Sequence, residues 1–257
     1  MNYIGIDIGS TCAKTVVLNE KKEFIQEFVQ PTGWSSVDTA EEILQKLKLA
    51  GINLSDDPSC CVATGYGRIS VPYADKAVTE ITCHALGAVH LFHQPDLTVI
   101  DIGGQDTKII QIEQGFVKDF IMNDKCAAGT GRFLEVMANT LSLRPNEMFE
   151  LARLGSDTTI SSMCTVFAES EVIGLICKGE PKENIAYAVV DSTIRKVTAQ
   201  LSRMNGEMST FCLTGGLCEC EYIREALSKK LGKEVISSPD ARYAGAIGAA
   251  LSAMKIR

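Results

Sequence analysis

The feature of this sequence that most constrains its fold is a nine-residue segment that occurs twice. Ile6–Lys14 (IDIGSTCAK) and Ile100–Lys108 (IDIGGQDTK) align without gaps and share five of nine positions. β-Branched apolar residues flank each copy, which predicts a strand, a tight turn and a second strand. A repeat with this wide spacing is too long for a solenoid and indicates a duplicated domain. The alternative is a chance likeness between two hairpins.

The two turns have the composition of phosphate-binding loops. Glycines and small hydroxyl side chains let backbone N–H groups approach phosphate oxygens closely. An aspartate ends the first strand of each copy, and Asp7 and Asp101 are therefore predicted to hold Mg²⁺ directly or through water. We expect both hairpins to face one polyphosphate. The residues predicted to contact it, besides the two aspartates, are Gly9, Ser10, Thr11, Lys14, Gly103, Gly104 and Gln105.

Two cysteines stand ahead of predicted helices. Cys126 lies in the segment NDKCAAGTGRFLE, residues 123–135, and Cys164 in SSMCTVFAESEV, residues 161–172. The helical spacing of apolar residues predicts an amphipathic helix after each cysteine. The apolar positions are Phe133, Val136, Met137 and Leu141 in the first helix, and Phe167, Val172, Ile173 and Ile176 in the second.

A helix N-terminus carries a partial positive charge and N–H donors, which lower the pKa of a cysteine and favour its thiolate. That environment suits an iron–sulfur cluster. A cubane cluster takes four thiolates, so a two-fold symmetric dimer that shares one cluster would complete the set. The alternative is that Cys126 and Cys164 are ordinary half-buried cysteines.

The other cysteines are scattered, which is not the pattern of a small disulfide framework. Six lie in apolar or strand-like runs and are expected to pack in the core: Cys12, Cys60, Cys61, Cys83, Cys177 and Cys212. Cys218 and Cys220 form a C-x-C pair in a predicted loop, where metal binding is an alternative to packing.

Composition bounds the class of protein. With 257 residues, 46% of them hydrophobic, the chain can bury one large core or two modest ones. It has no apolar run long enough for a membrane span, and its N-terminus enters a strand pattern at once. The net charge of -7 comes from interspersed acidic and basic residues. We therefore expect a soluble, cytoplasmic protein that binds neither nucleic acid nor membranes.

Periodicity and turn signals predict further elements between these motifs. The expected strands are residues 24–31, 60–64 and 235–238, and an apolar strand that opens the segment FCLTGGLCE, residues 211–219. The expected helices are residues 37–50, 78–92, 146–154, 185–204, 221–231 and 241–255.

The paired hairpins resemble the phosphate-1 and phosphate-2 loops of the actin, Hsp70 and sugar kinase ATPase superfamily. FCLTGGLCE resembles that superfamily's adenosine motif, which places Gly215 and Gly216 by the adenosine. The resemblance implies an α/β fold of two duplicated actin-like ATPase (ribonuclease H-like) domains with an interdomain nucleotide cleft. Residues 1–95 would form the first domain, with the C-terminal helix 241–257 packing back on it. Residues 96–240 would form the second, which carries the cluster cysteines.

The same resemblance implies a catalytic set of Glu80, Asp101 and Gln105. Glu80 matches the place, on the connecting helix, of the residue that orients the attacking water. A carboxylate there would act as a general base or position the water. The alternative is a helix N-terminal charge that the dipole favours. Gln105 is a second candidate for placing the water.

The two cysteine segments narrow the resemblance over nearly the whole chain. MNDKCAAGTGRFLE and SSMCTVFAESEV resemble the activator component of 2-hydroxyacyl-CoA dehydratases, a family that also includes subunits of benzoyl-CoA reductase. This implies a homodimer with one 4Fe-4S cluster bridging Cys126 and Cys164 of both subunits, and ATP/ADP with Mg²⁺ in each. A ferredoxin or flavodoxin would supply one electron, and ATP hydrolysis would drive its transfer to an iron–sulfur dehydratase.

Several alternatives stay open. The acceptor would be a double-cubane cluster protein or benzoyl-CoA reductase in place of a dehydratase. A more distant alternative is a small-molecule kinase of the superfamily, similar to N-acetylglucosamine kinase, which would lack an iron–sulfur chromophore. A nucleotide-dependent redox sensor would show no ATP turnover with any electron acceptor.

Overall fold

The computed structural model describes residues 1–54, 58–161, 164–204 and 210–256, which form two compact units. Unit 1 comprises Met1–Asp96, Ile112–Lys118 and Asp240–Arg257, and unit 2 comprises Leu97–Gln111 and Asp119–Pro239. The second domain predicted from the sequence, residues 96–240, includes the segment 112–118, which belongs here to unit 1. Among the described residues, no helix combines the length and apolar character that crossing a membrane requires.

Each unit is built on a five-stranded sheet, and the two sheets have the same strand order. Unit 1 has the order β3-β2-β1-β4-β5, and the second sheet reads β8-β7-β6-β9-β10 in the same direction. The bounds in the first sheet are β1 (Asn2–Ile8), β2 (Cys12–Leu18), β3 (Phe24–Pro31), β4 (Ser59–Thr64) and β5 (Lys76–Ala77). Those in the second are β6 (Leu97–Ile102), β7 (Thr107–Glu113), β8 (Phe116–Asn123), β9 (Thr210–Gly215) and β10 (Val235–Ile236). The duplicated α/β fold predicted from the repeated hairpin is thereby confirmed.

The strand directions are also repeated. In the first sheet β1 is antiparallel to β2 and parallel to β4, and in the second β6 is parallel to β9. Asp7 is paired with Thr64, and Asp101 with Thr214. The repeat thus extends beyond the two hairpins to a Thr-Gly pair at the end of a parallel strand, Thr64-Gly65 at β4 and Thr214-Gly215 at β9.

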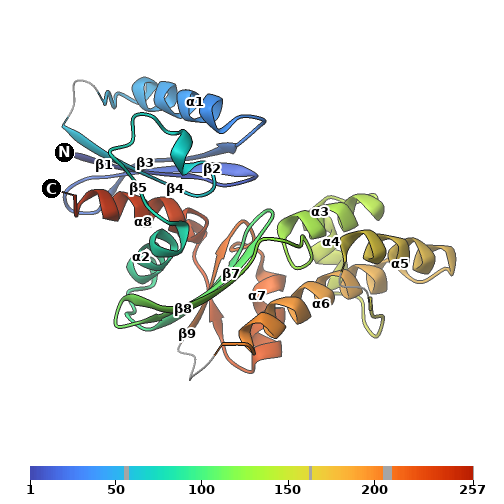
Figure 1. Cartoon of the computed structure of the whole chain (residues 1–257). Helices are drawn as coiled ribbons and strands as arrows, with labels where there is room; N and C mark the ends of the chain where they lie inside the picture. Colours follow the sequence, from blue (N-terminus) through green and yellow to red (C-terminus); the bar gives the residue numbers. More distant parts are fainter. Residues whose placement is uncertain (55–57, 162–163, 205–209, 257) are drawn as a thin grey trace. The chain divides into compact units, whose positions relative to one another are not determined.

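Helices cover both faces of the first sheet. Figure 1 shows α1 (Ser36–Leu49) on one face and α2 (Glu80–Phe92) with α8 (Ala244–Ala253) on the other. Alternate residues of a strand point to opposite faces, so in β2 Val17 packs with α1, whereas Val16 packs with α8. The sequence signal for α1 is a capped start, because the Ser35 side chain accepts a hydrogen bond from the Asp38 N–H.

Unit 2 has one large core between its sheet and its helices. Apolar residues of the strands, such as Ile100 and Leu213, pack with residues of the helices, such as Phe133 and Val189. The helices are α3 (Gly131–Thr140), α4 (Pro145–Ala152), α5 (Thr165–Cys177), α6 (Lys182–Leu201) and α7 (Glu221–Leu231). Two short 3₁₀ helices, Arg68–Ser70 and Pro239–Tyr243, complete the described elements.

The predicted helices and strands occur, with shifted ends. The C-terminal helix begins at Ala244, not at residue 241, because residues 239–243 form a 3₁₀ turn. Strand β8 is absent from the sequence prediction. It lies at the edge of its sheet with most of its residues exposed, so it lacks the buried alternation that marks a strand.

Candidate nucleotide and cysteine sites

The first predicted phosphate turn, residues 9–11, is held by hydrogen bonds within unit 1. The Gly9 N–H donates to the Cys12 carbonyl (3.1 Å), and the Thr32 side chain donates to the Gly9 carbonyl (2.7 Å). Gly9 and Ser10 are half-buried, and Thr11 is exposed. Hydrogen bonds at Gly9 thus hold the base of the turn, and its tip at Thr11 is exposed to solvent.

Asp7 lies buried at the end of β1, with backbone packed closely around its carboxylate. A Cβ added at Gly65 would lie 2.5 Å from Oδ1, and one at Gly245 would lie 2.5 Å from Oδ2. The His84 Nε2 atom is 4.0 Å from Oδ2. Lys14 stands opposite Asp7 in the strand register, and its amine makes no ion pair with a described residue. This side of unit 1 therefore offers a carboxylate and an available ammonium group.

The second predicted phosphate turn repeats this geometry with one difference. The Gly103 N–H donates to the Asp106 carbonyl (2.9 Å), as Gly9 does to Cys12. Here the equivalent of Lys14 is buried: the Lys108 Nζ lies 3.3 Å from Asp101 Oδ2 and 2.9 Å from Asp106 Oδ1. Thr214 donates to Asp101 Oδ1 (2.7 Å). The charge of Asp101 is therefore compensated inside the unit.

Gly215, which is predicted from the sequence to lie beside the adenosine, lies close to Asp101. Gly215 has a φ of +84°, and a Cβ there would lie 2.5 Å from the Ile102 carbonyl oxygen and 3.0 Å from Asp101 Oδ1. Gly65 has the same φ and stands in the same relation to Ile8 and Asp7. The sequence interpretation missed this equivalence, although both glycines follow a threonine after an apolar strand. Gly216 is exposed, with open space around its Cα.

The two candidates for positioning water belong to different units. Glu80 is the half-buried first residue of α2, and Gln105 is exposed in the turn of unit 2. Burial raises the pKa of the Cys83 thiol to about 12, and the nearby Asp7 and Glu80 carboxylates act in the same direction. Glu80 thus lies near the same thiol as Asp7. The choice between Glu80 and Gln105 stays a prediction.

Cys126 lies in the loop 124–130 that leads from β8 to α3. The helix begins at Gly131 with Thr130 as its N-cap, so Cys126 precedes the helix without belonging to its first turn. Its carbonyl accepts a hydrogen bond from the Asn123 side chain (2.8 Å). The thiol-bearing residue is half-buried.

Cys164 is the N-cap residue of α5 and is exposed. The helix packs on α3 through Ala168 and Val172, and Thr140 donates to Glu169 (3.1 Å). Residues 162 and 163 of the predicted cysteine segment lie outside the described residues.

The apolar face predicted for α5 is wrong in most of its members. Of Phe167, Val172, Ile173 and Ile176, only Val172 is buried; Phe167 is 69% exposed and Ile173 is 49% exposed. Apolar residues occur on several sides of this helix, and only Ala168 and Val172 are buried in the core of unit 2. We refer to Val166, Phe167, Ile173 and Ile176 as the exposed apolar face of α5.

Most of the remaining cysteines lie where packing was predicted. Cys60, Cys61, Cys83 and Cys212 are buried, and Cys12 is half-buried, but Cys177 at the end of α5 is exposed, so its assignment to the core was wrong. Cys218 is buried and Cys220 is the half-buried N-cap of α7. In the part of the chain that the structure describes, no three His, Cys, Asp or Glu side chains gather into a metal-binding group.

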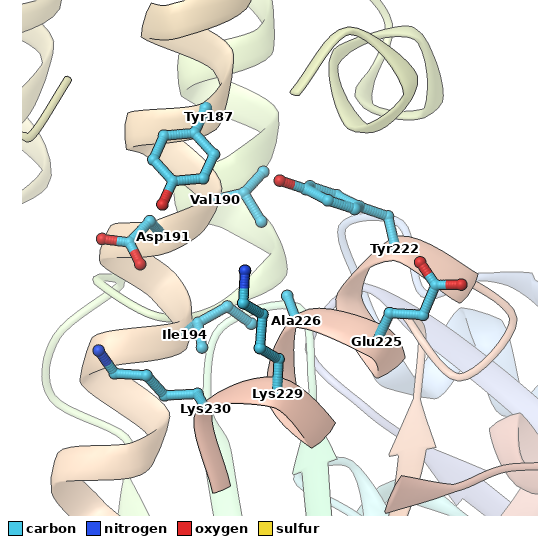
Figure 2. Close-up of a pocket in the computed structure, with 9 residues that line it drawn as sticks. All are labelled: Tyr187, Val190, Asp191, Ile194, Tyr222, Glu225, Ala226, Lys229 and Lys230. Atoms are coloured by element: carbon cyan, nitrogen blue, oxygen red, sulfur yellow. The ribbon is translucent and has the colours of Figure 1, made fainter. Parts of the chain in front are cut away.

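A pocket of about 440 Å³ lies between α6 and α7, and none of the predicted site residues lines it (Figure 2). Its lining combines two aromatic rings, three apolar side chains, two carboxylates and two lysines: Tyr187, Val190, Asp191, Ile194, Tyr222, Glu225, Ala226, Lys229 and Lys230. The carboxylate of Asp191 pairs with Arg195 (2.8 Å). The pocket is thus separate from the predicted nucleotide contacts.

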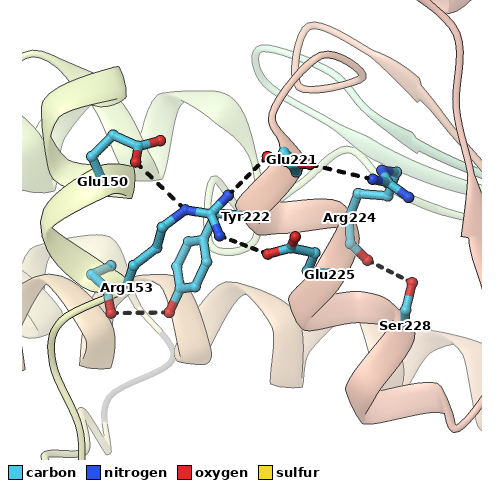
Figure 3. A network of polar contacts seen from close by, with 8 residues as sticks. Glu150, Arg153, Glu221, Tyr222, Arg224, Glu225 and Ser228 are labelled. Carbon is cyan, nitrogen blue, oxygen red and sulfur yellow. Dashed lines mark hydrogen bonds and ion pairs between the residues drawn. The ribbon is translucent and has the colours of Figure 1, made fainter.

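A polar network beside this pocket fixes α7 to α4 (Figure 3). The Arg153 guanidinium pairs with Glu225 (2.7 Å) and lies 5.2 Å from the centre of the Tyr222 ring. The Tyr222 hydroxyl donates to the Ala152 carbonyl (3.1 Å). Exposed ion pairs add little to the stability of a fold. The Tyr222 ring against Arg153, and its hydrogen bond to Ala152, hold the first turn of α7 on α4, a few residues after Gly215 and Gly216.

Comparisons with known proteins identify the family of this chain. Residues 4–253 match the model of the BadF/BadG/BcrA/BcrD ATPase family. The (R)-2-hydroxyglutaryl-CoA dehydratase activating ATPase of Acidaminococcus fermentans is 43% identical over 255 residues, with 98% of this chain and 96% of the relative covered.

Two solved structures are similar over the whole chain. Component A of the Acidaminococcus fermentans (R)-2-hydroxyglutaryl-CoA dehydratase has a TM-score of 0.92 at 42% identity, covering 100% of this chain and 98% of that one. The activator of the Clostridium difficile 2-hydroxyisocaproyl-CoA dehydratase, with bound ADPNP, has a TM-score of 0.89 at 34% identity, covering 100% and 95%. The chain described here belongs to the BadF/BadG/BcrA/BcrD ATPase family.

Proposed function

We propose that this chain is an ATP-dependent electron donor that activates a 2-hydroxyacyl-CoA dehydratase or a related iron–sulfur enzyme. It would work as a homodimer that shares one 4Fe-4S cluster. The relatives are named as activators of such dehydratases. The observation that carries the proposal is local to unit 2, where hydrogen bonds join the predicted phosphate turn to the start of α3, directly after the Cys126 loop.

The nucleotide half of the proposal rests on the repeated turns. Asp7 and Asp101 are buried oxygen donors of the kind that Mg²⁺ prefers. Since Lys108 and Thr214 already bond Asp101, this carboxylate would meet the cation through water, and Asp7 would meet it more directly. Lys14 would pair with a phosphate oxygen. The cation would neutralise phosphate charge during hydrolysis.

The cysteine half rests on Cys126 and Cys164, both carried by unit 2. They are the thiols expected to hold half of a cubane cluster, and a second copy of the chain would provide the other half. The cluster, when bound, would supply one low-potential electron. The exposed apolar face of α5 begins beside Cys164 and supports a protein partner at this end of the helix.

The partners follow from the same proposal. A ferredoxin or flavodoxin would donate the electron in the cytoplasm, and a dehydratase or a double-cubane cluster protein would accept it. A small-molecule kinase is the second candidate. Phosphoryl transfer gives no role to cysteines ahead of α3 and α5, so Cys126 and Cys164 favour the electron donor.

The test is an anaerobic purification followed by iron and sulfide analysis and an EPR spectrum of the reduced protein. About four irons per dimer are expected. The protein should also reduce an acceptor dehydratase, and this reduction should require ATP. A colourless protein that still binds ATP would overturn the proposal and leave the kinase as the better candidate.

We expect Asp101→Asn to lower Mg²⁺-dependent ATP hydrolysis on the order of 100-fold. The amide keeps the size of the side chain and an oxygen for the Thr214 hydroxyl, but it loses the negative charge that would be shared between Lys108 and the cation. Steady-state ATPase rates at a series of Mg²⁺ concentrations measure this. Asp119→Asn, on exposed β8, is the matched control and should behave as wild type. An unchanged Mg²⁺ dependence in Asp101→Asn would remove this residue from the site.

A further inference from the structure

A single buried side chain joins the strand after the second phosphate turn to the Cys126 loop. Thr107, the first residue of β7, is 1% exposed, and its hydroxyl donates to the Gly129 carbonyl (2.7 Å). In sequence, Thr107 follows closely on Gln105 of the turn, and Gly129 follows closely on Cys126. The bond therefore spans the short distance between the two predicted sites of unit 2.

Two main-chain bonds run beside it. The Gly131 N–H donates to the Gly103 carbonyl (2.9 Å), and the Arg132 N–H donates to the Gly104 carbonyl (2.8 Å). These carbonyls belong to the peptide groups whose N–H atoms are those of Gly104 and Gln105. Neither of these N–H groups makes a hydrogen bond to a described residue. In a trans peptide the C=O and N–H point in opposite directions, so the same planar groups hold α3 on one side and present donors on the other.

The Cys126 loop is itself tied together, so it can move as one piece. The Asn123 amide donates to the carbonyls of Cys126 (2.8 Å) and Ala128 (3.2 Å). The Thr130 hydroxyl donates to the Ala127 carbonyl (2.6 Å). A displacement at Gly129 is therefore expected to be carried to Cys126.

We propose that Thr107 is a positioning residue that couples the nucleotide state of the turn 103–105 to the Cys126 loop. The inference rests on the proposed function in one respect, namely that nucleotide phosphates contact this turn. A ligand shifts a second site only when its contacts differ between the two states. The γ-phosphate is the group that differs between ATP and ADP. Its contacts with the N–H groups of Gly104 and Gln105 would act on the peptide groups that hold the start of α3, and Thr107 would carry the same movement to Gly129.

The measurement is hydrogen exchange of the amides of the Cys126 loop, residues 124–130, in the full chain with ADP or with a non-hydrolysable ATP analogue, each with Mg²⁺. In wild type we expect the exchange rates of these amides to differ between the two nucleotides. In Thr107→Val, which removes the donor and keeps the β-branched shape, loss of one buried hydrogen bond should raise their rates about tenfold. The difference between nucleotides should disappear, while nucleotide affinity stays within about threefold of wild type.

The chain offers a matched control in the same sheet. Thr98 in β6 is fully buried, and its hydroxyl has no hydrogen-bond partner among the described residues. Thr98→Val makes the same atomic change without loss of a bond, so it should respond to nucleotides as wild type does. Thr107→Ser keeps the donor and should restore the response, which a purely steric role of the methyl group would not predict.

Three results would overturn the coupling. The first is an equal exchange response in Thr107→Val and wild type, and the second is a wild-type loop that responds to neither nucleotide. The third is a loss of nucleotide affinity in Thr107→Val as large as its loss of response, because the hydroxyl would then serve the nucleotide site itself. The exchange experiment needs no iron, so a chain without a cluster would sink the electron-donor proposal and leave this result to be judged separately.

Discussion

The variant with both Cys126→Ser and Cys164→Ser is expected to contain no iron or sulfide and to transfer no electron, while it still hydrolyses ATP. A serine hydroxyl is not ionised near neutral pH and is a poor ligand for iron compared with a thiolate. In a dimer the double substitution would remove every protein ligand of a shared cluster. The iron content, the visible spectrum and the ATPase rate of the anaerobically purified variant measure the outcome.

The surroundings of the two cysteines make loss of folding a poor explanation for that result. Cys164 occupies the N-cap of α5, a position that serine favours, so the helix should keep its start. The hydrogen bond from Asn123 goes to the main-chain carbonyl of Cys126 and survives the change of side chain. Cys177→Ser, at the exposed far end of α5, is the control and should retain full iron. Iron that persists in the double variant would show that other residues hold the cluster.

The duplicated fold could be predicted because its signals are local. An aspartate at the end of an apolar strand, a glycine in the turn and a lysine in the next strand are all read within nine residues. The matched strand orders are what a duplicated domain predicts. The register places Lys14 opposite Asp7, as a hairpin of this length requires.

Contacts between distant parts of the chain could not be predicted in this way. Nothing near Thr107 in the sequence indicates that its hydroxyl reaches Gly129. The sequence does show Asp106 where the first copy has Cys12, but it does not show that Lys108 is buried in contact with both Asp101 and Asp106.

The wrong apolar face of α5 and the missed strand β8 have the same physical cause. Apolar periodicity identifies the residues that could be buried in a chain's own core, but it does not identify those that stay exposed. Phe167 on α5 and Phe116 on β8 are both exposed in the isolated chain. A partner surface and a core surface have similar compositions, so the sequence alone does not separate them.

Gly248→Ala is expected to destabilise the protein by about 3 kcal/mol or more, which is large beside the 5–15 kcal/mol that stabilises a typical domain. A Cβ on Gly248 of α8 would collide with the main-chain carbonyl of Cys83 in α2. A backbone atom in the middle of a helix cannot rotate away as a side chain would, so the two helices must separate. Thermal and denaturant unfolding of the variant beside wild type measure the loss.

A glycine-to-alanine substitution in α5 should leave the stability unchanged or raise it. The comparison separates the effect of close packing from any general effect of alanine. No atom lies within 4 Å of a Cβ built on Gly174, and alanine is favoured over glycine in a helix by about 1 kcal/mol. Gly174→Ala should therefore unfold at the same or a higher temperature than wild type. An unfolding midpoint for Gly248→Ala equal to that of wild type would mean that α2 and α8 do not cross as closely as described. Because α8 also brings Gly245 against the Asp7 carboxylate, a real separation of these helices should weaken nucleotide binding in Gly248→Ala as well, and Gly174→Ala should leave it unchanged.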